Sequence, residues 1–110
     1  MKAARFHPKA RDVLKGFPED IRRELGKAIF DLQRGRRLSM PLSRPMPSVA
    51  AGAEELRLKD RTGAYRVFYL AKLVDGVLVF HAFTKKVQKT PHRDMAMGQK
   101  RLKEMLHEES

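Results

Sequence analysis

Residues 63–91 read GAYRVFYLAKLVDGVLVFHAFTKKVQKTP, and this stretch decides the fold. Two apolar and aromatic runs flank Asp75-Gly76, a dipeptide typical of the tight turn between paired strands. We therefore expect strands over residues 64–72 and 77–84, both apolar at nearly every position and hence central in a sheet. A cluster of lysines follows the second strand, so the hairpin would deliver several positive charges to one place.

The composition favours one domain, residues 1–110, with a nucleic-acid partner. The chain is 42% hydrophobic and carries a net charge of +11. Such a charge attracts nucleic acid, an anionic membrane surface or an acidic protein. Nucleic acid is favoured because the charges lie beside aromatic strands. No cysteine, no long apolar run and no secretory signal are present, which predicts a cytoplasmic protein without disulfides or a membrane span.

The remaining segments predict helices around a small sheet. Residues 2–6 are compatible with a first strand, and two short helices joined at residues 16–18 form a helical hairpin whose apolar stripe covers the sheet. Residues 36–52 contain three prolines and form a loop, either a basic flap or a plain connector. Residues 54–59 alternate and form a strand. Thr90 caps a last helix with Pro91 in its first position.

Several chemical motifs are missing from the sequence. There is no Gly-rich phosphate loop, no HExxH, no Cys/His metal spacing and no GxSxG. The four histidines, His7, His81, His92 and His107, are scattered without ligand spacing. The sequence therefore predicts neither a metal site nor a cofactor, and a two-carboxylate or two-metal mechanism has little support.

A cationic set on the sheet remains, and Arg66 is its most informative member. A guanidinium inside an apolar strand is costly unless it is paired or faces a wet cleft. One interpretation is a salt bridge to Glu54, Glu55 or Asp60. The other is a phosphate-facing arginine on a concave sheet surface. The full set is Arg57, Lys59, Arg61, Arg66, Lys85, Lys86 and Lys89.

Such a set is compatible with metal-free RNA cleavage, in which the ribose 2′-OH attacks its own phosphate. The protein then aligns the atoms, moves protons and stabilises negative charge. A lysine acts as base if neighbouring cations lower its pKa. The catalytic candidates are Lys59, Arg66, Lys85 and Lys86. The RNA-binding candidates are Arg57, Arg61 and Lys89, Tyr65 and Phe83 for base stacking, and His92 and Arg93, although His92 also fits a plain exposed histidine at a helix start.

The residues also resemble a known family. GAYRVFY, HAFTKKVQKTP, the LRLKD strand and the basic last helix are similar to the HigB-like, phage-related branch of the RelE/ParE toxin superfamily. The pattern FxKKxQKTP over residues 83–91 is the most specific part. The resemblance implies an α/β (α+β) fold, in which an N-terminal helical hairpin packs on a small, mainly antiparallel sheet, followed by a C-terminal helix.

The resemblance further implies the toxin of a type II toxin–antitoxin system, a metal-independent, ribosome-dependent mRNA endoribonuclease (mRNA interferase). Its partners would be a helix-turn-helix (HigA-like) antitoxin, the ribosome and mRNA, with no small-molecule cofactor. The family positions correspond to Arg66, to Lys85 and Lys86, and to Arg57 and Lys59. RelE carries a site tyrosine near its C-terminus, whereas no tyrosine follows Tyr69 here, so His92 substitutes or lysine and arginine act alone.

The same fold serves other activities, so two alternatives remain open. ParE relatives poison DNA gyrase without cleaving RNA. A degenerate phage-related protein would only bind an antitoxin or nucleic acid through its basic surface.

Overall fold

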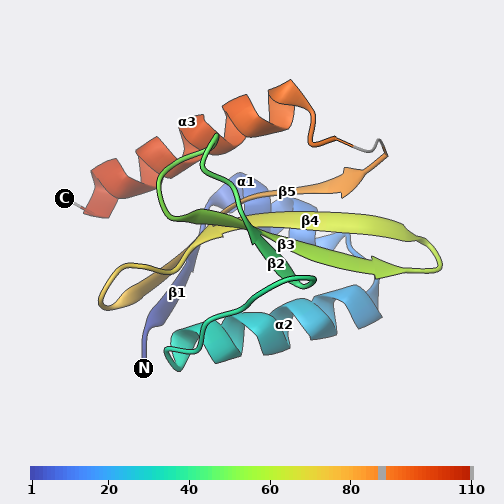
Figure 1. The fold of residues 1–110 in the computed structure, drawn as a ribbon, viewed down its shortest axis with the longest axis horizontal. Coiled ribbons are helices and arrows are strands. Elements are labelled where there is room, and N and C mark those ends of the chain that lie inside the picture. The colour runs from blue at the N-terminus through green and yellow to red at the C-terminus, as the bar shows by residue number, and fades with distance from the viewer. Residues whose placement is uncertain (87–88, 110) are drawn as a thin grey trace.

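The computed structural model describes residues 1–86 and 89–109, and within them a five-stranded sheet lies between helices (Figure 1). Val87 and Gln88, two positions of the 83–91 motif, lie outside the described residues, as does Ser110. The elements in chain order are β1 (Ala3–Phe6), α1 (Pro8–Lys15), α2 (Glu19–Gln33), β2 (Ser43–Pro45), β3 (Ala53–Asp60), β4 (Gly63–Leu70), β5 (Gly76–Lys85) and α3 (His92–Glu109).

The strands lie in the order β1-β5-β4-β3-β2, with three antiparallel pairings and one parallel pairing, β1 with β5. The expected meander of β3, β4 and β5 is therefore confirmed. The tight turn expected at Asp75-Gly76 is wrong, because β4 ends at Leu70 and Gly76 already pairs with Ala3 of β1. Residues 71–75 make a longer connection, and a register shift lies between Phe68 and Tyr69.

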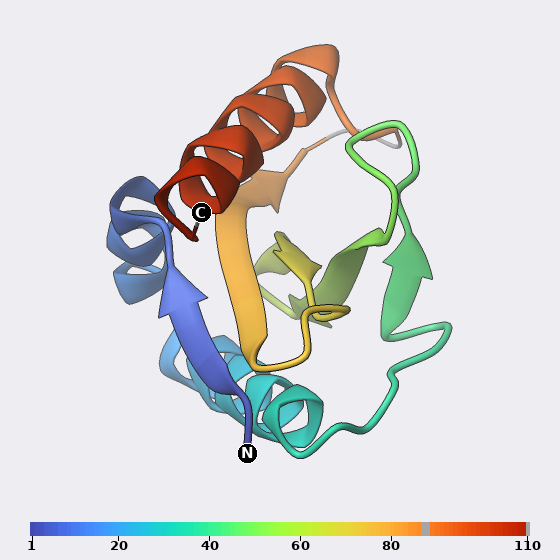
Figure 2. The same ribbon diagram turned by 90° about the vertical axis from the view of Figure 1, so that its left-hand side faces the viewer.

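Each face of the sheet carries its own apolar core, because β4 and β5 have apolar residues at both phases of the two-residue period. Ile21, Leu25 and Ile29 of α2 and Leu14 of α1 pack on one face. On the other face, Leu102 and Met105 of α3 pack with Phe68 and Phe80. Figure 2 shows α2 and α3 on opposite sides of the sheet. The predicted mixed α/β class is confirmed, but the chain begins with a strand, not with the helical hairpin.

Two local predictions need correction. The segment 36–52 was expected to be a loop, yet Ser43–Pro45 forms edge strand β2 against β3. An edge is where a strand tolerates proline, so the prolines did not exclude it. Thr90 was expected to cap α3, but α3 begins at His92 and the Thr90 hydroxyl donates to Glu55 instead.

Among the described residues, no helix is both long and apolar enough to cross a membrane.

Candidate functional site

Basic side chains gather on the α3-facing side of the sheet, at the end that α3 leaves uncovered. Arg57 of β3 pairs with Arg66 of β4, which pairs with Phe83 of β5. One step further along, Lys59 and Lys85 flank Ala64. Directly opposed residues have Cβ atoms about 4.5–5.5 Å apart and project from the same face. The sheet therefore brings Arg57, Lys59, Arg66 and Lys85 together, as the sequence predicted.

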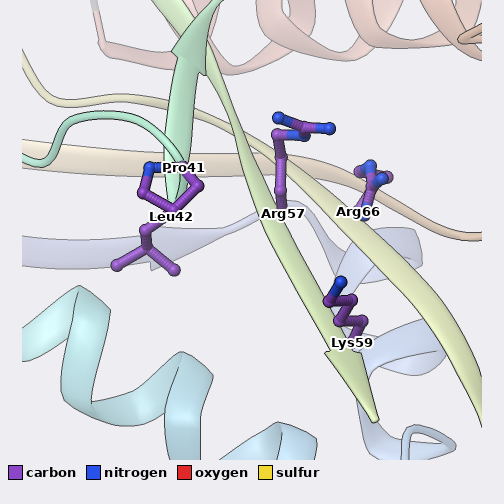
Figure 3. A pocket seen from close by; sticks show the side chains of 5 residues that line it. All are labelled: Pro41, Leu42, Arg57, Lys59 and Arg66. Carbon is purple, nitrogen blue, oxygen red and sulfur yellow. The ribbon is translucent and has the colours of Figure 1, made fainter. Parts of the chain in front are cut away.

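A pocket of about 280 Å³ opens beside these residues. Pro41, Leu42, Arg57, Lys59 and Arg66 line it (Figure 3). In Figure 3 the side chains of Arg57 and Lys59 extend from β3 in one direction, while Pro41 and Leu42 lie just before β2, with the Leu42 side chain pointing toward α2. The lining of the pocket therefore combines two apolar residues, Pro41 and Leu42, with three basic residues.

The arginines of this pocket keep hydrogen-bond donors unused. Arg66 is only 7% exposed and donates to the Tyr65 carbonyl at 3.2 Å, while its Nε lies 3.8 Å from Glu55 Oε1 without a hydrogen bond. Arg57 has a buried, unpartnered Nε, and its Nη1 contacts Met40 Sδ at 3.9 Å. Because like charges opposed across strands repel, an anion bound in this pocket would relieve the repulsion between Arg57 and Arg66.

The structure bears out the salt-bridge interpretation of Arg66, while the phosphate-facing interpretation stays a prediction. Of the three carboxylates proposed as its partner, Glu55 is the one that pairs with it. Glu54 instead accepts a hydrogen bond from Ser43, and Asp60 accepts from Thr62. The ion pair with Glu55 leaves the Arg66 guanidinium facing the pocket with donors to spare.

The pKa values of two cations are shifted. The pKa of Lys85 lies below its usual value, first because of burial and then because of Arg66, with Glu55 opposing the shift. Burial also lowers the pKa of Arg66, again opposed by Glu55. The sequence had predicted a lowered lysine pKa from clustered cations, and the direction agrees, although desolvation is the larger cause.

The outer candidates are exposed. Arg61 lies in the turn between β3 and β4, and Lys86 follows the end of β5, so both flank the same end of the sheet. Lys89 precedes α3, and His92 and Arg93 open it.

The two stacking candidates lie on different faces. Phe83 is half-buried next to Arg66 on the basic face, with its ring stacked on His81 at 5.4 Å. Tyr65 points to the opposite face, where it packs on Phe17 at 4.8 Å and binds Thr62, because it is one residue out of phase with Arg66. Tyr65 therefore does not reach this site.

Sequence reasoning missed two members of the site, Arg44 and Thr90, and named Glu55 only as one of three possible partners of Arg66. Glu55 Oε1 accepts from Arg44 Nε at 3.0 Å, and Glu55 Oε2 accepts from Thr90 Oγ1 at 3.0 Å. Arg44 belongs to β2, which the sequence does not predict, and Thr90 matches the pattern of a helix cap. The one available signal was Glu55 itself, an acidic residue in phase with Arg57 and Lys59 on an alternating strand.

A second polar cluster, also missed, joins α3 to β5. Arg101 Nη1 donates to His81 Nδ1 at 2.9 Å, and His81 Nε2 lies 2.8 Å from Asp94 Oδ1. Because a guanidinium only donates, Nδ1 accepts and the proton sits on Nε2, facing Asp94. Burial lowers the pKa of His81, which fits this neutral form. Arg101 is partly buried.

In the part of the chain that the structure describes, no three His, Asp or Glu side chains are grouped so as to hold a metal ion. The site is thus built from cations, with one buried carboxylate at its base.

Comparisons with known proteins agree with this architecture. The family described as "Phage derived protein Gp49-like (DUF891)" matches residues 12–103. A solved structure, the isolated E. coli RelE toxin in its P21 form, superposes with a TM-score of 0.55 at 18% identity, covering 81% of this chain and 89% of that one. Among curated proteins, none matches the sequence. The structural likeness shows a shared fold, and the family match spans most of the chain.

Proposed function

Because the chain belongs to the phage-derived Gp49-like family and shares the RelE fold, we propose that it is a toxin of a type II toxin–antitoxin pair, which cleaves mRNA on the ribosome without a metal ion. Within the RelE superfamily it would belong to the HigB-like branch. Its partners would be a helix-turn-helix antitoxin of the HigA type, the ribosome and mRNA.

One observation carries this proposal: the buried Arg66 and the half-buried Arg57 lie opposite each other across neighbouring strands and line one pocket. A phosphodiester bound in this pocket supplies negative oxygens that pair with the two guanidinium groups. The charge on those oxygens grows as the 2′-OH attacks, so fixed cations stabilise the transition state more than the ground state. Arg57 and Arg66 are accordingly assigned to the phosphate.

Lys85 is the candidate for proton transfer, because its lowered pKa brings it closer to neutral pH. Lys59 lies in the same row across Ala64, where it would add charge stabilisation. Lys86 is exposed and follows Lys85 directly, so we propose a catalytic role for it as well. Phe83 offers the base a stacking surface next to Arg66.

The proposal is tested by inducing the protein in cells and mapping mRNA 5′ ends. We expect new ends within translated codons, absent when translation is blocked, and lost in Arg66→Ala. The matched control is Arg22→Ala, which removes an exposed arginine of α2 and makes the same charge change. Cleavage by purified protein and ribosomes in the presence of EDTA tests the metal-independence.

Two outcomes would contradict this function. Intact mRNA during growth arrest would exclude cleavage as the cause of toxicity. Accumulated gyrase–DNA cleavage complexes, with toxicity unaffected by Arg66→Ala, would identify a gyrase poison on the same fold. Rescue of growth by the protein encoded next to this gene would identify the antitoxin in either case.

A further inference from the structure

A buried carboxylate lies at the base of the cationic site. The Glu55 side chain is 0% exposed, although it sits on the same strand face as Arg57 and Lys59. A buried carboxylate is costly unless several donors satisfy it, and a hydrophobic residue would fill the same space at lower cost. The position of Glu55 therefore calls for an explanation beyond packing.

Glu55 joins four separate parts of the chain. Arg44 of β2 and Thr90 of the segment before α3 each donate to it at 3.0 Å. Arg44 Nη2 also donates to Thr90 Oγ1 at 3.3 Å, which closes a triangle. Arg66 of β4 lies at 3.8 Å, close enough for attraction but outside hydrogen-bond distance. The Glu55 carboxylate thus forms a hydrogen bond with Arg44 and only a longer ion pair with Arg66.

This difference matches two different tasks. Arg44 uses both Nε and Nη2 in hydrogen bonds and has fewer donors left for a ligand, whereas Arg66 is attracted to Glu55 without a hydrogen bond to it. Thr90, which lies just before α3, is held against the sheet by its hydrogen bonds with Glu55 and Arg44. Resting on the proposed function, we propose that Glu55 is the positioning residue of the cationic site, orienting Arg66 for phosphate and anchoring the segment before α3 through Thr90.

The electrostatic surroundings of Lys85 give this role a measurable signature. The charged groups that face Lys85 are Arg44 from β2, Arg57, Lys59 and Glu55 from β3, and Arg66 from β4, while Asp94 and Arg101 of α3 engage His81 further along β5. Glu55 is the acidic group that raises the pKa of Lys85 against these cations. Neutralising Glu55 therefore lowers the pKa of Lys85 further.

The first test needs no catalytic activity. The Lys85 side-chain ammonium is titrated by NMR in the wild-type protein, in Glu55→Gln and in Glu54→Gln. Glu54 is the matched control, because it is the adjacent carboxylate on the same strand but points to the other face, where it accepts from Ser43. We expect a lower Lys85 pKa in Glu55→Gln alone. An unchanged Lys85 titration in Glu55→Gln would overturn the electrostatic part of the proposal.

The second test separates positioning from plain stability. In ribosome-dependent cleavage, we expect Glu55→Gln to lower kcat by about tenfold or more with a smaller change in KM, on the scale of one lost hydrogen bond to a charged group. The pH–rate profile should move to lower pH with the Lys85 pKa. A defect that only loosens the fold would reduce the active fraction without moving the profile, and that result would contradict the proposal.

Thr90 provides variants that keep the buried charge intact. Thr90→Val removes the hydroxyl at nearly constant volume and should reproduce part of the kcat loss, whereas Thr90→Ser should restore it. Equal activity of the valine and serine variants would refute the anchoring role. If the wild-type protein cleaves no mRNA at all, the proposed function fails by itself. The Lys85 titration and the affinity for a 2′-deoxy oligonucleotide still decide the role of Glu55.

Discussion

Gly98 of α3 is a position where a single added methyl group would contact the sheet too closely. A Cβ at Gly98 would lie 2.7 Å from Phe68 Cδ2 and 3.0 Å from Cε2. Carbon atoms pack best at about 3.5–4.0 Å, so Phe68 or the helix must move. Phe68 has little room, because it is fully buried against the rings of Phe80, His81 and Phe83.

The magnitude follows from comparing Gly98→Ala with Gly26→Ala. Gly26 lies in the exposed part of α2, where an added Cβ meets nothing within 4 Å. Alanine should stabilise a helix by about 1 kcal/mol relative to glycine at either position. Overpacking at Gly98 costs about 1–3 kcal/mol, so the two variants should differ by that amount. For a domain of 110 residues this corresponds to a Tm difference of about 4–13 °C.

The assay is urea unfolding followed by circular dichroism, with thermal melts as a second measure. We expect Gly26→Ala to be more stable than the wild-type protein and Gly98→Ala to be clearly less stable than Gly26→Ala. Because α3 carries Asp94 and Arg101, a displaced helix should also disturb the His81 cluster, visible in the His81 ring resonances. Equal stability of the two alanine variants would refute the close packing of α3 on Phe68.

Three further predictions address the site and its support. Lys85→Arg keeps the charge but cannot exchange a proton at neutral pH, so the rate of mRNA cleavage should fall by about 100-fold or more. The control variant Lys103→Arg, on the exposed face of α3, should stay active. Full activity of Lys85→Arg would show that Lys85 acts only through its charge. Phe83→Leu should weaken binding of single-stranded RNA by about 5-fold to 150-fold, the range expected for one stacked base, whereas Tyr65→Phe on the other face should not change it. The folded state lowers the pKa of His81 below its usual value of 6.5, so the unfolded chain takes up a proton at a higher pH, and the wild-type protein should lose stability as pH falls below that value. His81→Gln should be less stable at neutral pH, but its free energy of unfolding should depend less on pH. Parallel curves of unfolding free energy against pH for the two proteins would disprove the neutral form of His81.

The sequence predicted those parts of the fold that depend on local pattern. The two-residue alternation of residues 54–59 placed Arg57 and Lys59 on one face, and the apolar runs gave β4 and β5. The same alternation predicts that Arg66 shares that face once the register is known. Four cations of the site could thus be named in advance.

What the sequence could not predict depends on contacts between distant segments. Strand β2 is three residues long with a proline, so nothing local distinguishes it from a loop, and Arg44 stayed outside the predicted site. Thr90 matches a capping pattern, but in the structure its hydroxyl donates to the buried carboxylate of Glu55 on β3. Tyr65 was assigned to base stacking by its residue type, although its phase relative to Arg66 already placed it on the opposite face.

The parallel pairing of β1 with β5 has a consequence for folding during synthesis. The ribosome adds Gly76 73 residues after its partner Ala3 (76 − 3). Contacts of such long sequence separation form late, because the intervening chain must first be ordered. The nascent chain therefore cannot complete its sheet, or bring Lys85 beside Arg66, until β5 has emerged. If the cationic site acts on translating ribosomes, the late completion of the sheet would keep the new chain from acting on the ribosome that is synthesising it.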